Sequence, residues 1–133
     1  MKSLCGQALV ELAICMPVVL LLGLGTAEVV QVADATAGLQ AATEAAVTAA
    51  SRAPDPLEAA TAAEARFRAV IAAYPIESAD LVLADGGLIR GSVVTASSTG
   101  VVDLSWQSLP ILPARMRITA RASMRAEPWR THR

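Results

Sequence analysis

The chain has very few of the residues that build disulfide frameworks, metal sites and aromatic platforms. Its 133 residues include two cysteines, one histidine, one phenylalanine, one tyrosine and two tryptophans. Two cysteines cannot form the several bridges of a small disulfide-stabilised domain. The single histidine, His132, and the lack of cysteine, histidine and carboxylate clusters at ligand spacing argue against a metal centre. So few aromatic rings also argue against a platform on which nucleic-acid bases could stack.

Neither sign of charge dominates the chain. Eleven Lys and Arg residues against twelve Asp and Glu residues leave a formal net charge of −1, which gives no overall attraction to nucleic acid. The sequence also lacks a glycine-rich phosphate loop and a plausible pair of nucleophile and base. We therefore predict a protein that is not an enzyme, has no cofactor and no metal, and binds no nucleic acid.

What the chain does contain is a long hydrophobic run near its amino end, from Gln7 to Ala27. At roughly 1.5 Å per residue, its about 21 residues span about 31 Å, close to the hydrocarbon thickness of a bilayer. The run predicts a transmembrane helix, and we expect Pro17 in its middle to kink that helix. Lys2 before the run, with Glu28 and Asp34 after it, predicts that the amino end lies in the cytoplasm.

One carboxylate, Glu11, interrupts the run. An ionisable side chain in a membrane segment costs about 2.5 to 3.5 kcal/mol at the bilayer centre and less near the surface. A cut between Gly6 and Gln7 would create an amine at nearly the same depth as Glu11. That amine, on a neighbouring subunit, could neutralise the carboxylate when the helices pack side by side. Glu11 is therefore our candidate residue for assembly.

The same stretch resembles a known family. It reads GQALVELAICMPVVLLLGLGTAEVVQ, and its Leu9-Val10-Glu11-Leu12-Ala13 core, Pro17 and leucines 20–22 resemble the amino terminus of TadE-like proteins. These are minor pilins, or pseudopilins, of tight-adherence (Flp) pili in the type IV pilin superfamily. Leu12 departs from the phenylalanine that the family usually has. Near the other end, Ile118 to Arg125 is similar to the closing strand of the family.

The resemblance implies a minor pilin that contributes to pilus assembly and adhesion. A prepilin peptidase would cut it after Gly6, leaving Gln7 as the first residue. The protein would be a single-pass protein of the cytoplasmic (inner) membrane, surrounded by lipid, with its carboxyl-terminal domain outside, and would then enter the pilus. Its implied partners are the prepilin peptidase, other pilins or pseudopilins, and the inner-membrane assembly platform.

Several alternatives stay open. A secretory signal peptide would also be basic and then apolar, although this run is long and lacks a clear cleavage site. Cys15 loosely imitates a lipoprotein box, but Ile14 is large for the residue before a modified cysteine. The protein could serve a type II secretion system as a minor pseudopilin. It could also be an unprocessed single-pass membrane protein whose outer domain binds a partner.

After the run, the sequence predicts two helical segments. Residues 28–53 are rich in helix formers and continue the anchor as a rod, with a weak point at Gly38. Ala53 to Pro56 ends this rod, and Asp55 is a good N-cap for a second helix from Pro56 to about Ala73 that covers a sheet. Its predicted apolar stripe is Leu57, Ala60, Ala63, Phe67, Val70, Ile71 and Tyr74.

The rest of the sequence predicts antiparallel strands. We expect strands at 81–84, 88–96 and 101–106, with turns at 85–87 and 97–100. In the last strand Met116, Ile118, Ala120, Ala122 and Met124 alternate with polar residues, which predicts one core face and one basic face. The basic face, with Arg115, Arg117, Arg121 and Arg125, is either a solvated surface that discourages edge pairing or an interface for an acidic partner.

Helices followed by strands predict an α+β, pilin-like fold. In this interpretation the amino-terminal transmembrane helix extends into a long rod, and a second helix packs on a small antiparallel sheet. The predicted organisation is a prepilin leader at 1–6, the transmembrane helix at 7–27, the helical extension at 28–53 and an extracytoplasmic α+β domain at 54–133.

Overall fold

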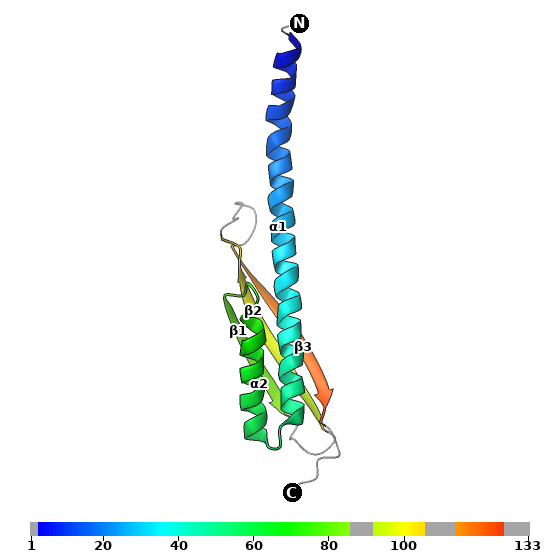
Figure 1. Ribbon diagram of the computed structural model, residues 1–133, viewed down its shortest axis with the longest axis vertical. Helices are drawn as coiled ribbons and strands as arrows, with labels where there is room; N and C mark the ends of the chain where they lie inside the picture. Colours follow the sequence, from blue (N-terminus) through cyan, green and yellow to red (C-terminus); the bar gives the residue numbers. More distant parts are fainter. Residues whose placement is uncertain (1–2, 86–91, 106–113, 127–133) are drawn as a thin grey trace.

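The computed structural model describes residues 3–85, 92–105 and 114–126. Two helices are followed by three strands (Figure 1). They are α1 (Ser3–Arg52), α2 (Pro56–Ile71), β1 (Ser78–Asp85), β2 (Val93–Asp103) and β3 (Arg115–Arg125). The predicted α+β, pilin-like fold is confirmed.

Helix α1 is a single element of 50 residues, about 75 Å long. Its amino-terminal half stands clear of the domain, and its carboxyl-terminal half lies against the sheet (Figure 1). The helix continues on both sides of Pro17, and the kink expected there stays a prediction. It also continues through the buried Gly38, so the weak point predicted at this residue is not seen as a break.

The core forms where α1 crosses the sheet. The buried side chains of α1 recur at helical spacing and are mostly alanines, which allow the helix axis to approach the strands closely. They pack with the inward residues of β2 and β3 in one cluster. The α1 members of that cluster are Ala35, Leu39, Ala42, Ala46 and Ala50.

Helix α2 begins as predicted. The Oδ1 atom of Asp55 accepts a hydrogen bond from the backbone N–H of Glu58 at 2.7 Å, which caps the helix, and Pro56 is the first helical residue. Its buried residues are Ala59, Ala63 and Phe67. The predicted stripe was therefore wrong at Leu57, which is 77% exposed, and at Ala60, which is exposed.

The reason is that α2 packs mainly against α1 and makes fewer contacts with β1. Residues spaced four apart then form its buried face, and this face is rotated from the one that a helix lying flat on a sheet would use. Figure 1 shows α2 beside α1 on the β1 side, while α1 crosses β2 and β3. The two helices together cover one face of the sheet.

The sheet is antiparallel with the order β1-β2-β3. The predicted turn at 97–100 was wrong, because β2 runs unbroken from Val93 to Asp103, and alternate residues face inward throughout. Ser98 points into the core, where its hydroxyl lies 2.6 Å from that of Thr43. Gly100 also faces inward, and a Cβ there would lie 3.3 Å from Ile76.

The other strand boundaries differ in smaller ways. Strand β1 begins at Ser78, earlier than expected. The predicted turn at 85–87 and the start of the predicted strand at 88–96 fall largely within 86–91, outside the described residues. In β3 the predicted alternation is confirmed in the middle of the strand, where Ile118 and Ala120 are buried and Arg117, Thr119 and Arg121 are exposed. The predicted core face was wrong at its two ends, because Met116 and Met124 are each 41% exposed.

Candidate functional site

The first part of α1 carries an apolar surface that contacts nothing else in the described chain. Within the described residues one helix is long and apolar enough to cross a membrane, by length and composition. A contiguous exposed apolar surface of this kind is rare on a soluble monomer and marks contact with a membrane or a partner. Its exposed large side chains are Leu9, Val10, Leu12, Ile14, Met16, Val18, Val19, Leu20, Leu21, Leu22 and Leu24.

Glu11 is exposed within this apolar surface. Its neighbours along the chain, Val10 and Leu12, are 60% and 59% exposed. Among the residues that the structure describes, no ion pair involves Glu11. A carboxylate so placed in a membrane favours a cationic partner from another molecule.

The predicted processing junction lies on the same helix. Gly6 and Gln7 are within α1, and a Cβ added at Gly6 would meet no atom within 4 Å. The same is true of Gly23 and Gly25. Packing within the chain therefore does not require a glycine at position 6, although recognition by a peptidase would.

The amino-terminal half of α1 meets the domain at a polar contact that sequence reasoning missed. Glu28 is 7% exposed, and one turn further on Gln31 donates from Nε2 to the backbone carbonyl of Asp103 at 3.3 Å. This bond ties α1 to the end of β2 where the helix enters the domain. Gln31 and Asp103 are 72 residues apart, so no local sequence pattern could reveal the contact.

The four predicted arginines lie on the outer face of β3, but they are not equivalent. Arg115 donates to Glu77 Oε1 at 3.0 Å. It also lies opposite Asp103 on β2. The pKa of Asp103 is lowered chiefly by the hydrogen bond that its carboxylate accepts from the backbone N–H of Ser105, with a further contribution from the positive charge of Arg115. Arg115 is thus partly neutralised.

The remaining arginines, Arg117, Arg121 and Arg125, are exposed. Their side chains project from the face of the sheet that the helices do not cover, because alternate residues of a strand point to opposite faces. The structure therefore confirms the basic face as a geometric feature of the sheet. What binds to it stays a prediction.

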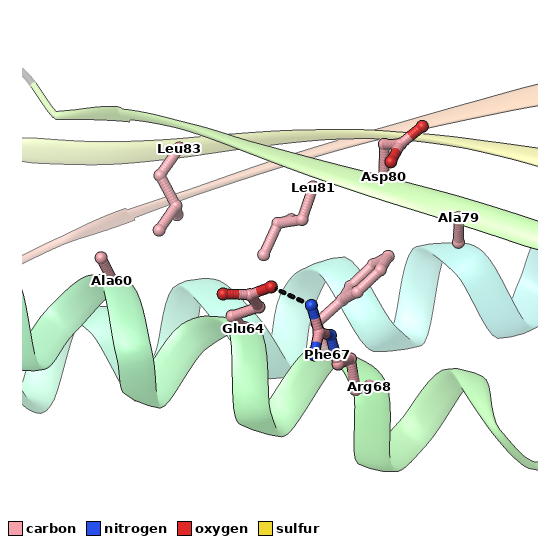
Figure 2. A pocket seen from close by; sticks show the side chains of 8 residues that line it. All are labelled: Ala60, Glu64, Phe67, Arg68, Ala79, Asp80, Leu81 and Leu83. Atoms are coloured by element: carbon pink, nitrogen blue, oxygen red, sulfur yellow. Dashed lines mark hydrogen bonds and ion pairs between the residues drawn. The ribbon is translucent and has the colours of Figure 1, made fainter.

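An open groove of about 350 Å³ lies between α2 and β1. Figure 2 shows Phe67, Leu81 and Leu83 at its apolar base and the Glu64–Arg68 ion pair of α2 along one side. A second groove, of about 400 Å³, lies between α1 and β3. Within the described ranges, no group of three or more His, Cys, Asp or Glu residues is placed to hold a metal ion.

A comparison with known protein families finds a match to the amino-terminal part of the chain. A family model described as TadE-like protein matches residues 6–48. The match begins at the predicted junction and includes the apolar surface, Glu11 and most of the buried part of α1. The resemblance seen in this stretch is therefore confirmed. No curated protein and no solved structure shows significant similarity to the chain.

Proposed function

We propose, from the premise that residues 6–48 are a TadE-like segment, that the chain is a minor pilin (pseudopilin) of a tight-adherence type IV pilus. In this proposal a prepilin peptidase removes residues 1–6, and α1 anchors the mature protein in the cytoplasmic (inner) membrane. The α+β domain faces outward and contributes to pilus assembly and adhesion. The observation that carries the proposal is a TadE-like match that begins at Gly6, on an exposed apolar helix.

The exposure pattern of α1 supports separate roles for its two halves, the first in the membrane and the second in the core of the domain. From Leu9 to Leu22 the large apolar side chains are more than half exposed, whereas from Ala35 onward the helix contributes fully buried residues to the core. A bilayer can cover the first part and the sheet covers the second. One helix thus serves as both the membrane anchor and the central element of the outer domain.

Glu11 is the proposed assembly residue. After cleavage, the new amine of Gln7 would lie one helical turn before Glu11, since residues four apart share a face of a helix. When two mature copies pack side by side, the amine of one can neutralise the carboxylate of the other. Pairing offsets the free energy, up to about 2.5 to 3.5 kcal/mol, of holding an unpaired carboxylate in the membrane.

The first experiment is amino-terminal analysis of the mature protein by mass spectrometry, in cells with and without their prepilin peptidase. We expect a chain that begins at Gln7 only when the peptidase is present. The variant Gly6→Leu should abolish this processing. Gly25→Leu is the matched control, because a Cβ added at either glycine meets no atom within 4 Å in the folded chain.

A mature chain that still begins at Met1 would refute the pilin assignment and favour an unprocessed membrane protein with an outer binding domain. A start beyond Ala27 would identify an ordinary secreted protein. The role of Glu11 is tested separately with Glu11→Leu, which should be processed normally but be lost from the sheared pilus fraction. Val18→Leu, a change on the same exposed apolar surface, should be recovered with the pili.

A minor pseudopilin of a type II secretion system remains the alternative within the same class. Both machines would process the chain after Gly6, so amino-terminal analysis does not separate them. Recovery of the mature protein with sheared tight-adherence pili, and its loss when their assembly platform is deleted, would support the proposal. Dependence on a secretion platform would support the alternative.

A further inference from the structure

The two outer strands of the sheet carry opposite charges. Strand β1 has Asp80 exposed on its outer face and contains no basic residue, and Glu77 lies just before it. Strand β3 contains four arginines and no acidic residue. In the described sheet β1 and β3 are both edge strands, so each has backbone N–H and C=O groups that no neighbouring strand pairs.

The hydrogen-bond pattern shows which backbone groups point toward the open side of β3. Leu104 N–H donates to the carbonyl of Ala114 at 2.8 Å, and Ala126 N–H donates to that of Ser92 at 2.9 Å, at the two ends of the β2–β3 ladder. In an antiparallel ladder alternate residues bond the same neighbour, so the even-numbered residues of β3 bond β2. The odd-numbered residues, arginines included, present their backbone groups to the open edge. The carbonyl of Arg121 accordingly accepts from Gln40 Nε2 at 3.5 Å.

The same alternation applies to β1. The odd-numbered residues of β2 bond β1, and Thr99 lies opposite Asp80. The open edge of β1 therefore belongs to Ala79, Leu81 and Leu83, whose side chains face the groove between β1 and α2 (Figure 2). A strand added to β1 would place its own inward side chains over this groove.

We propose that β3 of one copy pairs with β1 of a second copy, so that the sheets of adjacent copies join into one. Strands β1 and β3 each run antiparallel to β2 and therefore run parallel to one another. Copies anchored in the same membrane have their α1 helices pointing the same way, so the joining pair is parallel. The parallel orientation of the two strands rests on the proposed membrane anchoring. The opposite charges and the open edges are features of the fold and do not depend on that proposal.

The backbone geometry suits a parallel pair. In a parallel ladder, the N–H and C=O groups of one residue bond two different residues of the neighbouring strand. The side chains of those two residues lie on the face of the sheet opposite to the side chain of the first residue. The bonding residues of the β1 edge, such as Leu81, face inward, and those of the β3 edge, such as Thr119, face outward. A continuous sheet therefore keeps both sets of helices on the same side.

Pairing of like edges is disfavoured by the same features. Two β1 edges would bring aspartates together and two β3 edges would bring arginines together, and like charges directly opposite destabilise a sheet. A symmetric pair of edges would also run antiparallel and point the two anchors in opposite directions. The contact between unlike edges does not close on itself, so it produces a row of copies rather than a dimer.

Disulfide cross-linking of the full chain in lipid vesicles tests the proposal. Both native cysteines are replaced, as Cys5→Ser and Cys15→Ser. Val82→Cys then labels the outer face of β1, where Val82 is 62% exposed, and Thr119→Cys or Ser123→Cys labels β3. Facing residues of paired strands lie about 4.7 to 4.9 Å apart, within the roughly 4.4 to 6.8 Å between Cα atoms that a disulfide spans.

We expect disulfide-linked dimers when the β1-labelled and β3-labelled proteins share a vesicle, and little dimer when either is alone. Asp80→Arg or Arg121→Glu should lower the yield about two- to five-fold, as expected for like charges across a ladder. The combined variant Asp80→Arg/Arg121→Glu should recover it. Raising the salt to about 1 M, where the Debye length is about 3 Å, should lower the yield of the native pair.

Equal cross-linking of β1 to β1 or β3 to β3, or no cross-linking of the mixture, would overturn the proposal. The proposal would also be overturned if, in cells, the cysteines on β1 and β3 formed cross-links only to a different pilin and none between two copies of this chain. Circular dichroism of each variant establishes that a loss of yield is not a loss of folding. The vesicles contain no peptidase and no pilus machinery, so failure here is distinguishable from failure of the pilin assignment, which amino-terminal analysis decides.

Discussion

Replacement of Gly38 by alanine is expected to destabilise the domain, although the same change stabilises most helix interiors. Gly38 is buried in α1, where Tyr74, just beyond the end of α2, lies against it. An added Cβ would lie 2.7 Å from Cδ2 of Tyr74 and closer still to Cγ and Cδ1. These atoms belong to the base of the ring, so the whole side chain of Tyr74 would have to move.

Two effects of opposite sign decide the magnitude. Alanine in place of glycine stabilises a helix interior by about 1 kcal/mol. Forcing an extra carbon into a packed site costs about 1 to 3 kcal/mol. The half-buried Tyr74 has solvent on one side and can yield in part, which favours the lower half of that range. We therefore expect Gly38→Ala to lower the free energy of unfolding by up to about 1 kcal/mol.

The measurement is urea unfolding of the full chain in detergent micelles, followed by pulse proteolysis, which reports the unfolded fraction of the outer domain. In a double-mutant cycle, Tyr74→Ala removes the ring, and in that background Gly38→Ala should become stabilising. Stabilisation by Gly38→Ala in the native background would refute the reasoning. It would mean that the contact between Gly38 and Tyr74 is not close in solution.

Two further predictions follow from the polar contacts of the domain. The Thr43 hydroxyl donates its one hydrogen to the Leu39 carbonyl at 2.7 Å, so the Ser98 hydroxyl must donate to Thr43. Thr43→Val should therefore lower the free energy of unfolding by about 1 to 3 kcal/mol in the same urea assay. Ser98→Ala should lower it by less. Equal effects would contradict this direction of donation. The lowered pKa of Asp103 means that its ionised form favours folding, so its contribution is complete above the usual value of 3.8 and is lost as the pH falls through the lower, folded-state pKa. Asp103→Asn should flatten this part of the stability curve between pH 5 and pH 2, and an unchanged slope would show that the contact is not formed.

Local signals in the sequence predicted most of the elements and their ends. The apolar run, the Pro-Asp-Pro stop and the Asp55 cap each act within a few residues, and each appears in the structure where expected. The alternation of β3 identified its buried face for the same reason. The carboxylate at Glu11 and the glycine at position 6 stood out because they are unusual within a membrane-length helix.

The errors arose where distant residues decide the outcome. Ser97 to Gly100 have the composition of a turn, but Thr43 accepts the Ser98 hydroxyl and the core receives Gly100, so the segment continues as strand. The exposure of Leu57 depends on α2 packing mainly against α1, which the amphipathic pattern of α2 alone does not specify. The partners of Arg115 and Gln31 lie 38 and 72 residues away, beyond any local pattern.

The unbroken course of α1 has a mechanical consequence. Many membrane-anchored domains are connected to their anchor by a flexible tether, which can extend before any force reaches the domain. Here the helix that carries the membrane-length apolar surface is the same one whose Ala42, Ala46 and Ala50 are packed in the core, and Gln31 ties it to the end of β2. Tension applied to the anchor therefore acts at once as shear between α1 and the sheet, and the strength of that packing sets the force at which the domain gives way.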